Sequence, residues 1–209
     1  MVNREIEAKF FVKNLDRLEK RLLKMGAFLI QPRVLEVNQR YDRPDGSMRS
    51  NGQVLRLRQD RKVYLTYKGR GKSEAGIVSR EELEVAVSDM ETSAKILEAL
   101  GYMPSAFYEK YRRVYDLENC HIMLDELPYG DFIEIEGASL EDVKKTAALL
   151  RLDMLRAVER SYLGVYNDYC KVRNLPAGRL TFDIFQGKRP APEELGVQPA
   201  DEEGQPTGS

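Results

Sequence analysis

The 209-residue chain lacks the features that mark several large protein classes. Its 33 Lys and Arg residues are balanced by 34 Asp and Glu, so there is no overall basic field of the kind that holds nucleic acid. No apolar stretch approaches the roughly 20 residues of a membrane span, and no charged-then-apolar signal segment opens the chain. We therefore expect a cytoplasmic protein that binds neither nucleic acid nor membrane.

Cysteine and histidine are also scarce. Two cysteines, Cys120 and Cys170, are too few for a disulfide scaffold, and we expect both to be reduced. The single histidine, His121, excludes a His-rich metal cage and leaves any histidine-driven triad dependent on one residue. A bound metal would therefore be held by carboxylates, which favours hard ions such as Mg²⁺, Mn²⁺ or Ca²⁺.

Charged and apolar residues alternate along much of the chain, which is the pattern of strands. It predicts eight of them, over residues 4–11, 34–42, 54–59, 62–68, 79–87, 108–116, 120–125 and 131–136. Helices are expected after the N-cap residues Asn14, Ser88 and Ser139, and over residues 160–171. Hairpin-length connections imply antiparallel pairing, and eight strands without edge protection favour closure into a barrel.

The composition changes at Gly187, where prolines stand among acids and glycines and no aromatic residue follows. Such a segment has too little apolar surface to order itself. The predicted organisation is one domain over residues 1–186 and a disordered Pro-rich, acidic tail over residues 187–209.

Each predicted strand has one ionic face. For a single strand, the usual explanation is a charged face in solvent and an apolar face on a core. Across the strands, however, the apolar helices need apolar surfaces to cover, and the outer faces of a barrel would supply them. The ionic faces would then line a tunnel with seven acids and seven bases: Glu5, Glu7, Glu82, Glu84, Asp125, Glu134 and Glu136; Lys9, Arg56, Arg58, Lys68, Arg80, Lys110 and Arg112.

The predicted fold class is therefore α+β: an eight-stranded antiparallel β-barrel, or tunnel, with an ionic interior and helices covering it. Burying so many charges is unfavourable unless each is paired, hydrated or bound to a ligand. A highly charged ligand explains them best, with bases on one wall holding a polyanion and acids on another holding cations that bridge to it.

The motifs that carry these charges resemble those of one family. They are Glu5-Ile6-Glu7-Ala8-Lys9, Tyr41-Asp42-x-Pro44-Asp45-Gly46, Leu55-Arg56-Leu57-Arg58, Tyr67-Lys68-Gly69, Arg80-x-Glu82-x-Glu84, Lys110-x-Arg112, Leu124-Asp125 and Phe132-Ile133-Glu134-Ile135-Glu136-Gly137. In this order, over about residues 2–185, they resemble the CYTH superfamily, the triphosphate tunnel metalloenzymes. The family includes class IV adenylate cyclases, thiamine triphosphatases and inorganic triphosphatases. The resemblance implies an eight-stranded tunnel that acts on a triphosphate with a divalent metal.

Roles follow by position in these motifs. The resemblance implies metal-binding acids at Glu5, Glu7, Asp125, Glu134 and Glu136, with Mg²⁺ or Mn²⁺ as the cofactor. It implies a triphosphate clamp at Arg56, Arg58, Lys68, Lys110 and Arg112, to which we add Arg80 from the same ionic face. Glu82 and Glu84 fit either metal ligands or ionic braces for the bases.

Lys9 resembles a lysine that helps to activate water in some hydrolases of the family, together with a tyrosine. The usual Tyr-Tyr/Phe-Asp stretch reads Arg40-Tyr41-Asp42 here, so Arg40 replaces the first aromatic residue. We interpret the later cluster Tyr162, Tyr166 and Tyr169 as helix packing.

The resemblance implies an enzyme acting on a triphosphate-containing small molecule, with hydrolysis favoured because the sequence has no clear adenine-reading signature. The alternatives are a class IV adenylate cyclase that forms cAMP and pyrophosphate from ATP, and a non-catalytic polyphosphate-binding module.

Gly71-Lys72-Ser73 ends like a P-loop, but Thr66 stands where the first glycine is required, so we interpret residues 69–73 as a loop over the tunnel mouth. The oligomeric state stays open, a homodimer included.

Overall fold

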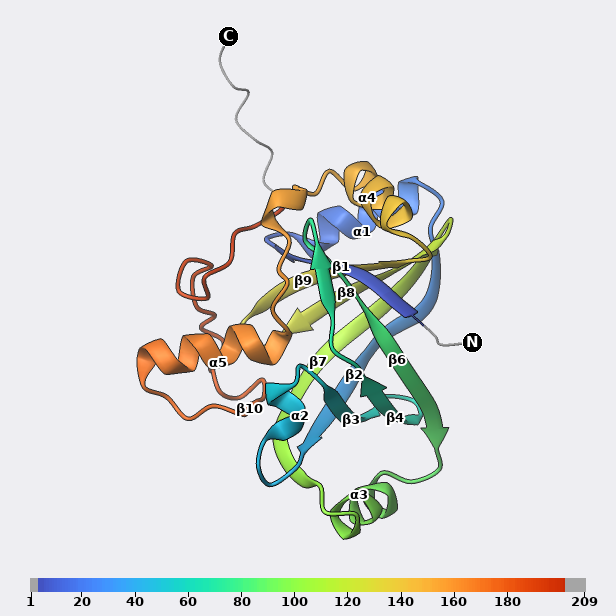
Figure 1. Cartoon of the computed structure of the whole chain (residues 1–209). Helices are drawn as coiled ribbons and strands as arrows, with labels where there is room; N and C mark the ends of the chain where they lie inside the picture. Colours follow the sequence, from blue (N-terminus) through green and yellow to red (C-terminus); the bar gives the residue numbers. More distant parts are fainter. Residues whose placement is uncertain (1–3, 202–209) are drawn as a thin grey trace.

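The computed structural model describes residues 4–201 (Figure 1). Its strands are β1 (Arg4–Val12), β2 (Phe28–Asp42), β3 (Val54–Gln59), β4 (Val63–Lys68), β5 (Lys72–Glu74), β6 (Ile77–Val87), β7 (Met103–Leu117), β8 (Cys120–Leu127), β9 (Gly130–Gly137) and β10 (Arg179–Leu180). Its α-helices are α1 (Leu15–Lys24), α2 (Ser47–Ser50), α3 (Met90–Ala99), α4 (Leu140–Leu149) and α5 (Tyr162–Arg173), with a 3₁₀ turn at Met154–Arg156.

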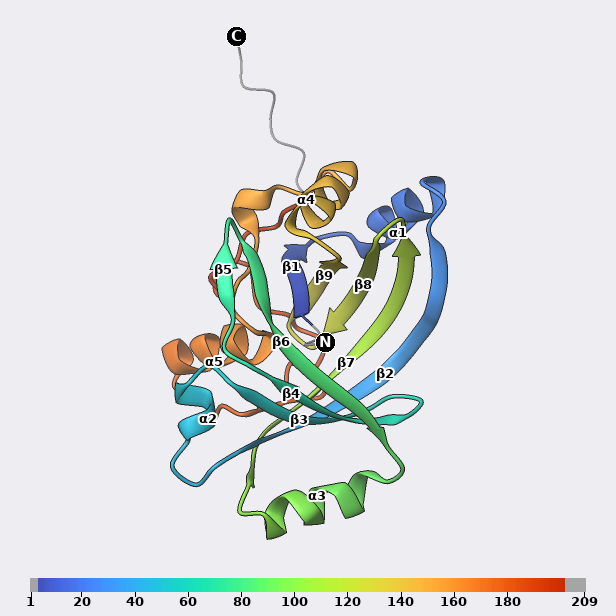
Figure 2. The same ribbon diagram turned by 45° about the vertical axis from the view of Figure 1, so that its right-hand side comes forward.

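Eight of these strands close into a ring. The hydrogen-bonded order is β1-β9-β8-β7-β2-β3-β4-β6, and β6 pairs back onto β1. All eight pairings in the ring are antiparallel, so the predicted eight-stranded antiparallel barrel is confirmed. Figure 2 shows β2 and β7 as the long curved wall of this barrel. The short β5 adds to β6, and β10 lies parallel to β7.

Polar residues begin the helices where the sequence places them. The side chains of Asn14 and Ser139 accept the hydrogen bonds that cap α1 and α4, as predicted. The cap of α3 is Asp89 and not the predicted Ser88, because it is the Asp89 carboxylate that accepts from the Thr92 N–H. No helix within residues 4–201 is long and apolar enough to cross a membrane.

Helices cover much of the outer surface of the barrel. Leu18 and Leu22 of α1 and Val143 of α4 are fully buried in a cluster that includes the outward side chains Ile133 and Ile135 of β9. Helix α5 covers a second, aromatic cluster, and α3 lies over a third one. The predicted arrangement of apolar outer faces under helices is therefore confirmed over these strands.

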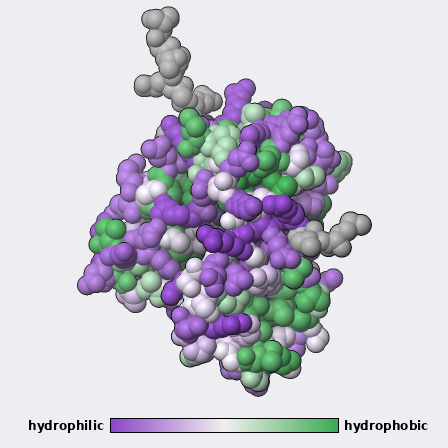
Figure 3. All heavy atoms as spheres, viewed as in Figure 1, coloured by the Kyte–Doolittle hydropathy of each residue, from purple (hydrophilic) through white to green (hydrophobic). Residues whose placement is uncertain are grey.

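Helices leave part of the outer face of β6 uncovered. Leu83 and Val85 are 52% and 57% exposed, and Ile96 and Leu100 at the neighbouring α3 are also exposed. Figure 3 shows apolar side chains gathered at this end of the molecule. The barrel wall here is stabilised by strand pairing and not by a helix.

The segment from Gly187 onward contradicts the prediction of disorder as far as Asp201. Leu195 and Val197 are buried in the α5 cluster, and Ala200 is buried in the α1 and α4 cluster. The Ala200 N–H donates to the carbonyl of Phe11, and the Asp201 carboxylate accepts from the N–H of Lys13. The segment needs no core of its own, because its few apolar residues are buried against the surface of the barrel. Residues 202–209 of the predicted tail lie outside the described residues.

This packing makes Leu195 a stabilising residue. We expect Leu195→Ala to lower the free energy of unfolding by about 2–5 kcal/mol, because it removes a buried side chain and leaves a cavity. Leu155→Ala is the matched control, since Leu155 is 95% exposed, and its effect should stay within about 0.5 kcal/mol. Urea denaturation of the three proteins tests this. Equal stabilities would show that the segment does not pack in solution.

Candidate active site

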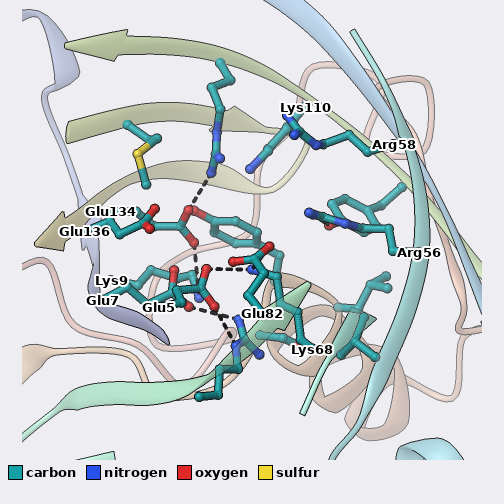
Figure 4. Close-up of a pocket in the computed structure, with 18 of the residues that line it drawn as sticks. Glu5, Glu7, Lys9, Arg56, Arg58, Lys68, Glu82, Lys110, Glu134 and Glu136 are labelled. Atoms are coloured by element: carbon teal, nitrogen blue, oxygen red, sulfur yellow. Dashed lines mark hydrogen bonds and ion pairs between the residues drawn. The ribbon is translucent and has the colours of Figure 1, made fainter. Parts of the chain in front are cut away.

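The barrel interior contains a cavity of about 290 Å³ lined mainly by charged side chains (Figure 4). Its acids are Glu5, Glu7, Glu82, Glu84, Glu134 and Glu136, and its bases are Lys9, Arg40, Arg56, Arg58, Lys68, Arg80, Lys110 and Arg112. Thus thirteen of the fourteen predicted tunnel residues line one cavity. The ionic faces point inward, as predicted.

The fourteenth predicted residue, Asp125, lies fully buried behind the cavity wall. Its carboxylate accepts from Lys110 at 2.9 Å, from Arg112 at 2.6 Å and from the Tyr162 hydroxyl at 2.7 Å. As the side chains stand, Asp125 holds bases of the cavity in place. Its predicted role as a metal ligand stays a prediction.

Bases of β3 and β7 form one wall of the cavity, which Figure 4 shows opposite the acids of β1 and β9; Arg112 of β7 instead contacts Glu134 on the acid side. Arg56, Arg58 and Lys110 lie on this base wall, with the fully buried Glu36 of β2 among them. Glu36 lies 3.6 Å from the Lys110 ammonium and 3.7 Å from the Arg58 guanidinium. Burial acts to raise the pKa of Glu36, but Lys110 and Arg112 outweigh it and lower that pKa.

Sequence reasoning missed Glu36, although a signal for it was present. Glu36, Asn38 and Arg40 alternate in β2 just as the charged residues do in the other strands, and Asn38 donates to Glu36 at 3.0 Å. Applying the alternation rule to this strand would have placed all three inside the barrel.

The acid wall consists of the glutamates of β1 and β9, and the lysines and arginines in contact with it do not neutralise all of its negative charge. Glu7 of β1 stands directly opposite Glu136 of β9 in the strand register, and like charges in this position repel. Burial raises the pKa of Glu136 to about 7, and Glu5 and Glu7 add to the effect. Burial also raises the pKa of Glu7, reinforced by Glu134 and Glu5.

The negative charges of Glu5 and Glu134 are offset by neighbouring basic side chains. Burial acts to raise the pKa of Glu5, but Lys68 at 2.6 Å and Arg80 at 2.7 Å outweigh it and lower that pKa to about 2. Burial likewise acts to raise the pKa of Glu134, and Arg112 with Lys9 lowers it well below its usual range. Glu5 and Glu134 are therefore ionised and held in place.

Glu82 and Glu84 differ in their surroundings. Glu84 contacts Arg58 at 2.8 Å and accepts from Thr66 at 2.7 Å, which is the contact pattern of an ionic brace for the base wall. Glu82 lies 3.2 Å from Lys68, and burial raises its pKa with a further contribution from Glu5. Glu82 thus belongs with the acid wall.

The acid wall suits a hard divalent cation in its chemistry. All its donors are carboxylate oxygens, and the raised pKa values of Glu7 and Glu136 mark negative charge that a cation would offset. Within residues 4–201, however, no three His, Cys, Asp or Glu side chains converge as a ready-made metal group. Binding a cation would require side chains such as Glu7, now 3.0 Å from Arg80, to turn toward it.

Lys9 lies between the acid wall and an aromatic ring. Its ammonium is 3.4 Å from Glu134 and 4.6 Å from the centre of the Tyr162 ring. Tyr162 packs in the α5 cluster, as predicted, and in addition its ring lines the cavity. Tyr166 does pack in the α5 cluster, as predicted, with Tyr169 against it.

Tyr41 lies outside this cavity. It is buried in the apolar cluster under α3, next to an irregularity in the β2–β7 register at Arg40. Arg40 itself faces the cavity, in the regular alternation with Glu36 and Asn38 that precedes the irregularity. Tyr162 is the tyrosine beside Lys9, and it comes from α5.

A second cavity of about 590 Å³ adjoins the first. The two share Arg40, Val54, Arg80, Ser161 and Leu163 as lining residues. Gly71, Lys72 and Ser73 also line it, so the P-loop-like segment does lie at a mouth of the tunnel, with part of it in β5. His121 lines neither cavity; its side chain is exposed and lies 3.3 Å from Asp116.

The sequence and the fold both match known proteins. A family model described as the CYTH domain matches residues 3–162. The chain is 27% identical over 176 residues to a Methanocaldococcus jannaschii protein named "putative adenylate cyclase", covering 82% of this chain and 99% of that one. These matches establish the family of the chain.

Two solved structures show the same fold. One is a "putative adenylate cyclase" from Vibrio parahaemolyticus, with a TM-score of 0.69 and 22% identity over 78% of this chain and 97% of that one. The other, from Hippeastrum, has a TM-score of 0.53 and 19% identity over 93% and 100%. It is described as a "putative adenylyl cyclase" with a dominant triphosphatase activity.

The raised pKa of Glu136 has a measurable effect on stability. Because its pKa is about 7 in the folded protein and near 4.5 when exposed, its protonated form stabilises the fold at low pH, and this is lost as the pH rises through 7. In metal-free buffer we therefore expect Glu136→Gln to raise Tm at pH 8 by about 2–8 °C, corresponding to about 1–2 kcal/mol after solvent screening. At pH 4.5 the two proteins should melt alike.

Glu81→Gln is the control, since Glu81 is an exposed glutamate of the same barrel. It should shift Tm little at either pH. A Glu136→Gln effect of the same size at both pH values would contradict the assignment of excess negative charge to this wall.

Proposed function

The chain belongs to the CYTH domain family, and from this premise we propose that it is a divalent-metal-dependent enzyme that binds a triphosphate-containing substrate in its tunnel and hydrolyses it. The observation that carries the proposal is the separation of charge inside the barrel. A wall of bases faces a wall of acids across one cavity of about 290 Å³. A polyanion bridged to the acids by cations would satisfy both walls.

The base wall would bind and orient the phosphates. Arg56 and Arg58 present planar forks that hold phosphate oxygens in pairs, and Lys110 acts as a point charge. Lys68 and Arg112 would complete the clamp from their positions beside Glu5 and Asp125. Glu84 and Asp125 hold Arg58 and Arg112 in position, so these donors are set before substrate arrives. Donors fixed in this way stabilise charge that develops on the leaving phosphate.

The acid wall would hold the metal. Glu5, Glu7, Glu134 and Glu136 are the oxygen donors for Mg²⁺ or Mn²⁺, with Glu82 beside them and Asp125 behind the base wall. The ion would supply charge neutralisation and Lewis-acid activation. In the protein itself, Lys9 would orient the attacking water, since it lies between Glu134 and the Tyr162 ring.

A class IV adenylate cyclase is the second candidate. The M. jannaschii relative carries a cyclase name, and the second cavity of about 590 Å³ offers room for an organic group attached to the phosphates. A non-catalytic polyphosphate-binding module is the third candidate. The full set of predicted metal-binding acids argues against it, because binding alone needs only the bases.

A substrate panel tests the activity. Inorganic triphosphate, ATP, GTP and thiamine triphosphate are each incubated with Mg²⁺ or Mn²⁺, and phosphate, pyrophosphate and cyclic nucleotide are measured. We expect phosphate release that depends on the metal and falls by at least about 100-fold in Glu136→Gln, with Glu81→Gln unaffected. Cyclic AMP with pyrophosphate would support the cyclase instead. Full activity in excess chelator would exclude the metal-dependent mechanism.

Lys9→Met separates catalysis from binding. If Lys9 orients water, the variant should lower kcat by about 10- to 100-fold and leave KM within a few-fold, the pattern of an interaction made chiefly in the transition state. Arg112→Gln should instead weaken substrate binding and turnover together. Lys62→Met, in an exposed turn, is the control. A loss of binding in Lys9→Met as large as the loss of kcat/KM would make Lys9 another clamp residue.

A further inference from the structure

Arg40 occupies an unusual electrostatic position in the barrel. It lies on β2 directly opposite Arg56 of β3 in the strand register, and both line the tunnel. Like charges facing each other across two strands repel. Arg40 also lines the second cavity, so it stands at the junction of the two.

No carboxylate neutralises Arg40. Every other base lining the tunnel forms at least one ion pair, and within residues 4–201 Arg40 forms none. Asp42 is the carboxylate that acts on it, but this group already accepts hydrogen bonds from the backbone N–H groups of Arg43, Met48 and Arg49. Arg40 is partly buried, and a partly buried guanidinium without an ion-pair partner favours a ligand that supplies the missing charge.

Arg56 and Tyr108 are the groups beside Arg40 in this part of the tunnel. Arg56 lies 3.9 Å from Glu84, its only ion-pair partner among residues 4–201, and its buried Nε has no hydrogen-bond partner there. Burial acts to raise the pKa of Tyr108, yet Arg56, Lys110 and Arg40 together outweigh it and lower that pKa. Burial lowers the pKa of Arg40 itself, and Arg56 and Arg80 contribute to the decrease.

We propose that Arg40, with Arg56 and the Tyr108 hydroxyl, forms an anion-binding subsite at the junction of the two cavities. It holds the phosphate group of a tunnel-bound triphosphate that lies nearest the second cavity. This inference rests on the proposed binding of a triphosphate in the tunnel, and it adds a phosphate contact that the family-like motifs do not include. An arginine suits the position because its fork binds two oxygens of one phosphate at once.

The subsite also gives the substrate a direction. The phosphates beyond Arg40 lie among Arg58, Lys110 and Arg112, whereas any group attached at the Arg40 end enters the second cavity. We expect a triphosphate to extend from Arg40 to the bases Arg58, Lys110 and Arg112. We expect a pyrophosphate, which is one phosphate shorter, to bind among those three bases and to leave Arg40 without a phosphate.

Calorimetric titration of inorganic triphosphate and inorganic pyrophosphate in metal-free buffer tests the subsite, because neither anion is then turned over. Arg40→Gln should weaken triphosphate binding by about 10- to 100-fold and pyrophosphate binding by no more than a few-fold. Arg40→Lys should fall between, since it keeps the charge and loses the fork. Arg43→Gln, an exposed arginine just after β2, is the matched control and should bind both anions as the wild type does.

Thermal unfolding of the ligand-free proteins separates a binding role of Arg40 from a structural role, because the two roles predict opposite changes in Tm. Arg40→Gln should raise the Tm of the ligand-free protein by about 1–4 °C, because it removes the repulsion between Arg40 and Arg56. Arg40→Lys should not. A lower Tm with unchanged triphosphate affinity would overturn the proposal and make Arg40 a structural residue.

The remaining outcomes are distinct. Equal losses for triphosphate and pyrophosphate would mean that Arg40 contributes only a general positive field, which overturns the subsite. Wild-type protein that binds triphosphate, with Arg40→Gln binding it equally well, would remove the subsite and leave the proposed function intact. Wild-type protein that binds neither anion, with or without Mg²⁺, would overturn both.

Discussion

Pairing of opposite charges inside a closed barrel is the interaction on which the rest of this structure depends. A closed ring of eight antiparallel strands leaves each strand with one inner and one outer face. Here the inner faces hold acids and bases in contact, as between Glu5, Lys68 and Arg80. Without these pairs, the desolvation of so many charges would outweigh what strand pairing contributes. The inward charges in turn oblige the apolar side chains to face outward, and so the hydrophobic core lies between the barrel and its helices.

Most of the charges in the tunnel form ion pairs, and the pairing is least complete at two places. On the acid wall, Glu7 and Glu136 face each other, and burial with neighbouring acids raises the pKa of both. At the junction with the second cavity, Arg40 faces Arg56 and has no ion-pair partner among residues 4–201. One region is short of positive charge and the other of negative charge. A polyanion accompanied by divalent cations would supply both, which is why the uncompensated charges are more informative about function than the paired ones.

The C-terminal part of the chain completes the site from outside the family-like motifs. Helix α5 brings Tyr162 to the end of the cavity, where its ring lies beside Lys9 and its hydroxyl binds Asp125. The segment through Asp201 then returns to β1 and fastens this region, with Arg160 donating to carbonyls of Leu195 and Gly196. Helix α5 and the segment through Asp201 therefore contribute both to the stability of the barrel and to the geometry of the site.

The sequence by itself determined the eight strands of the ring, their pairing direction and the inward ionic faces, because a period of two assigns each side chain to one of two faces whatever the fold around it. It therefore placed thirteen predicted residues in one cavity, and the same rule applied to β2 would have added Arg40 to that cavity and Glu36 to the barrel interior. It did not predict the short strands β5 and β10. Tertiary structure alone decided which charges found partners, since pairs such as Lys68 with Glu5 join strands far apart in the chain. It also decided that Tyr162 lines the site and that residues 187–201 pack. Composition indicates how much apolar surface a segment carries, whereas its order depends on whether another part of the molecule offers a surface to bury it.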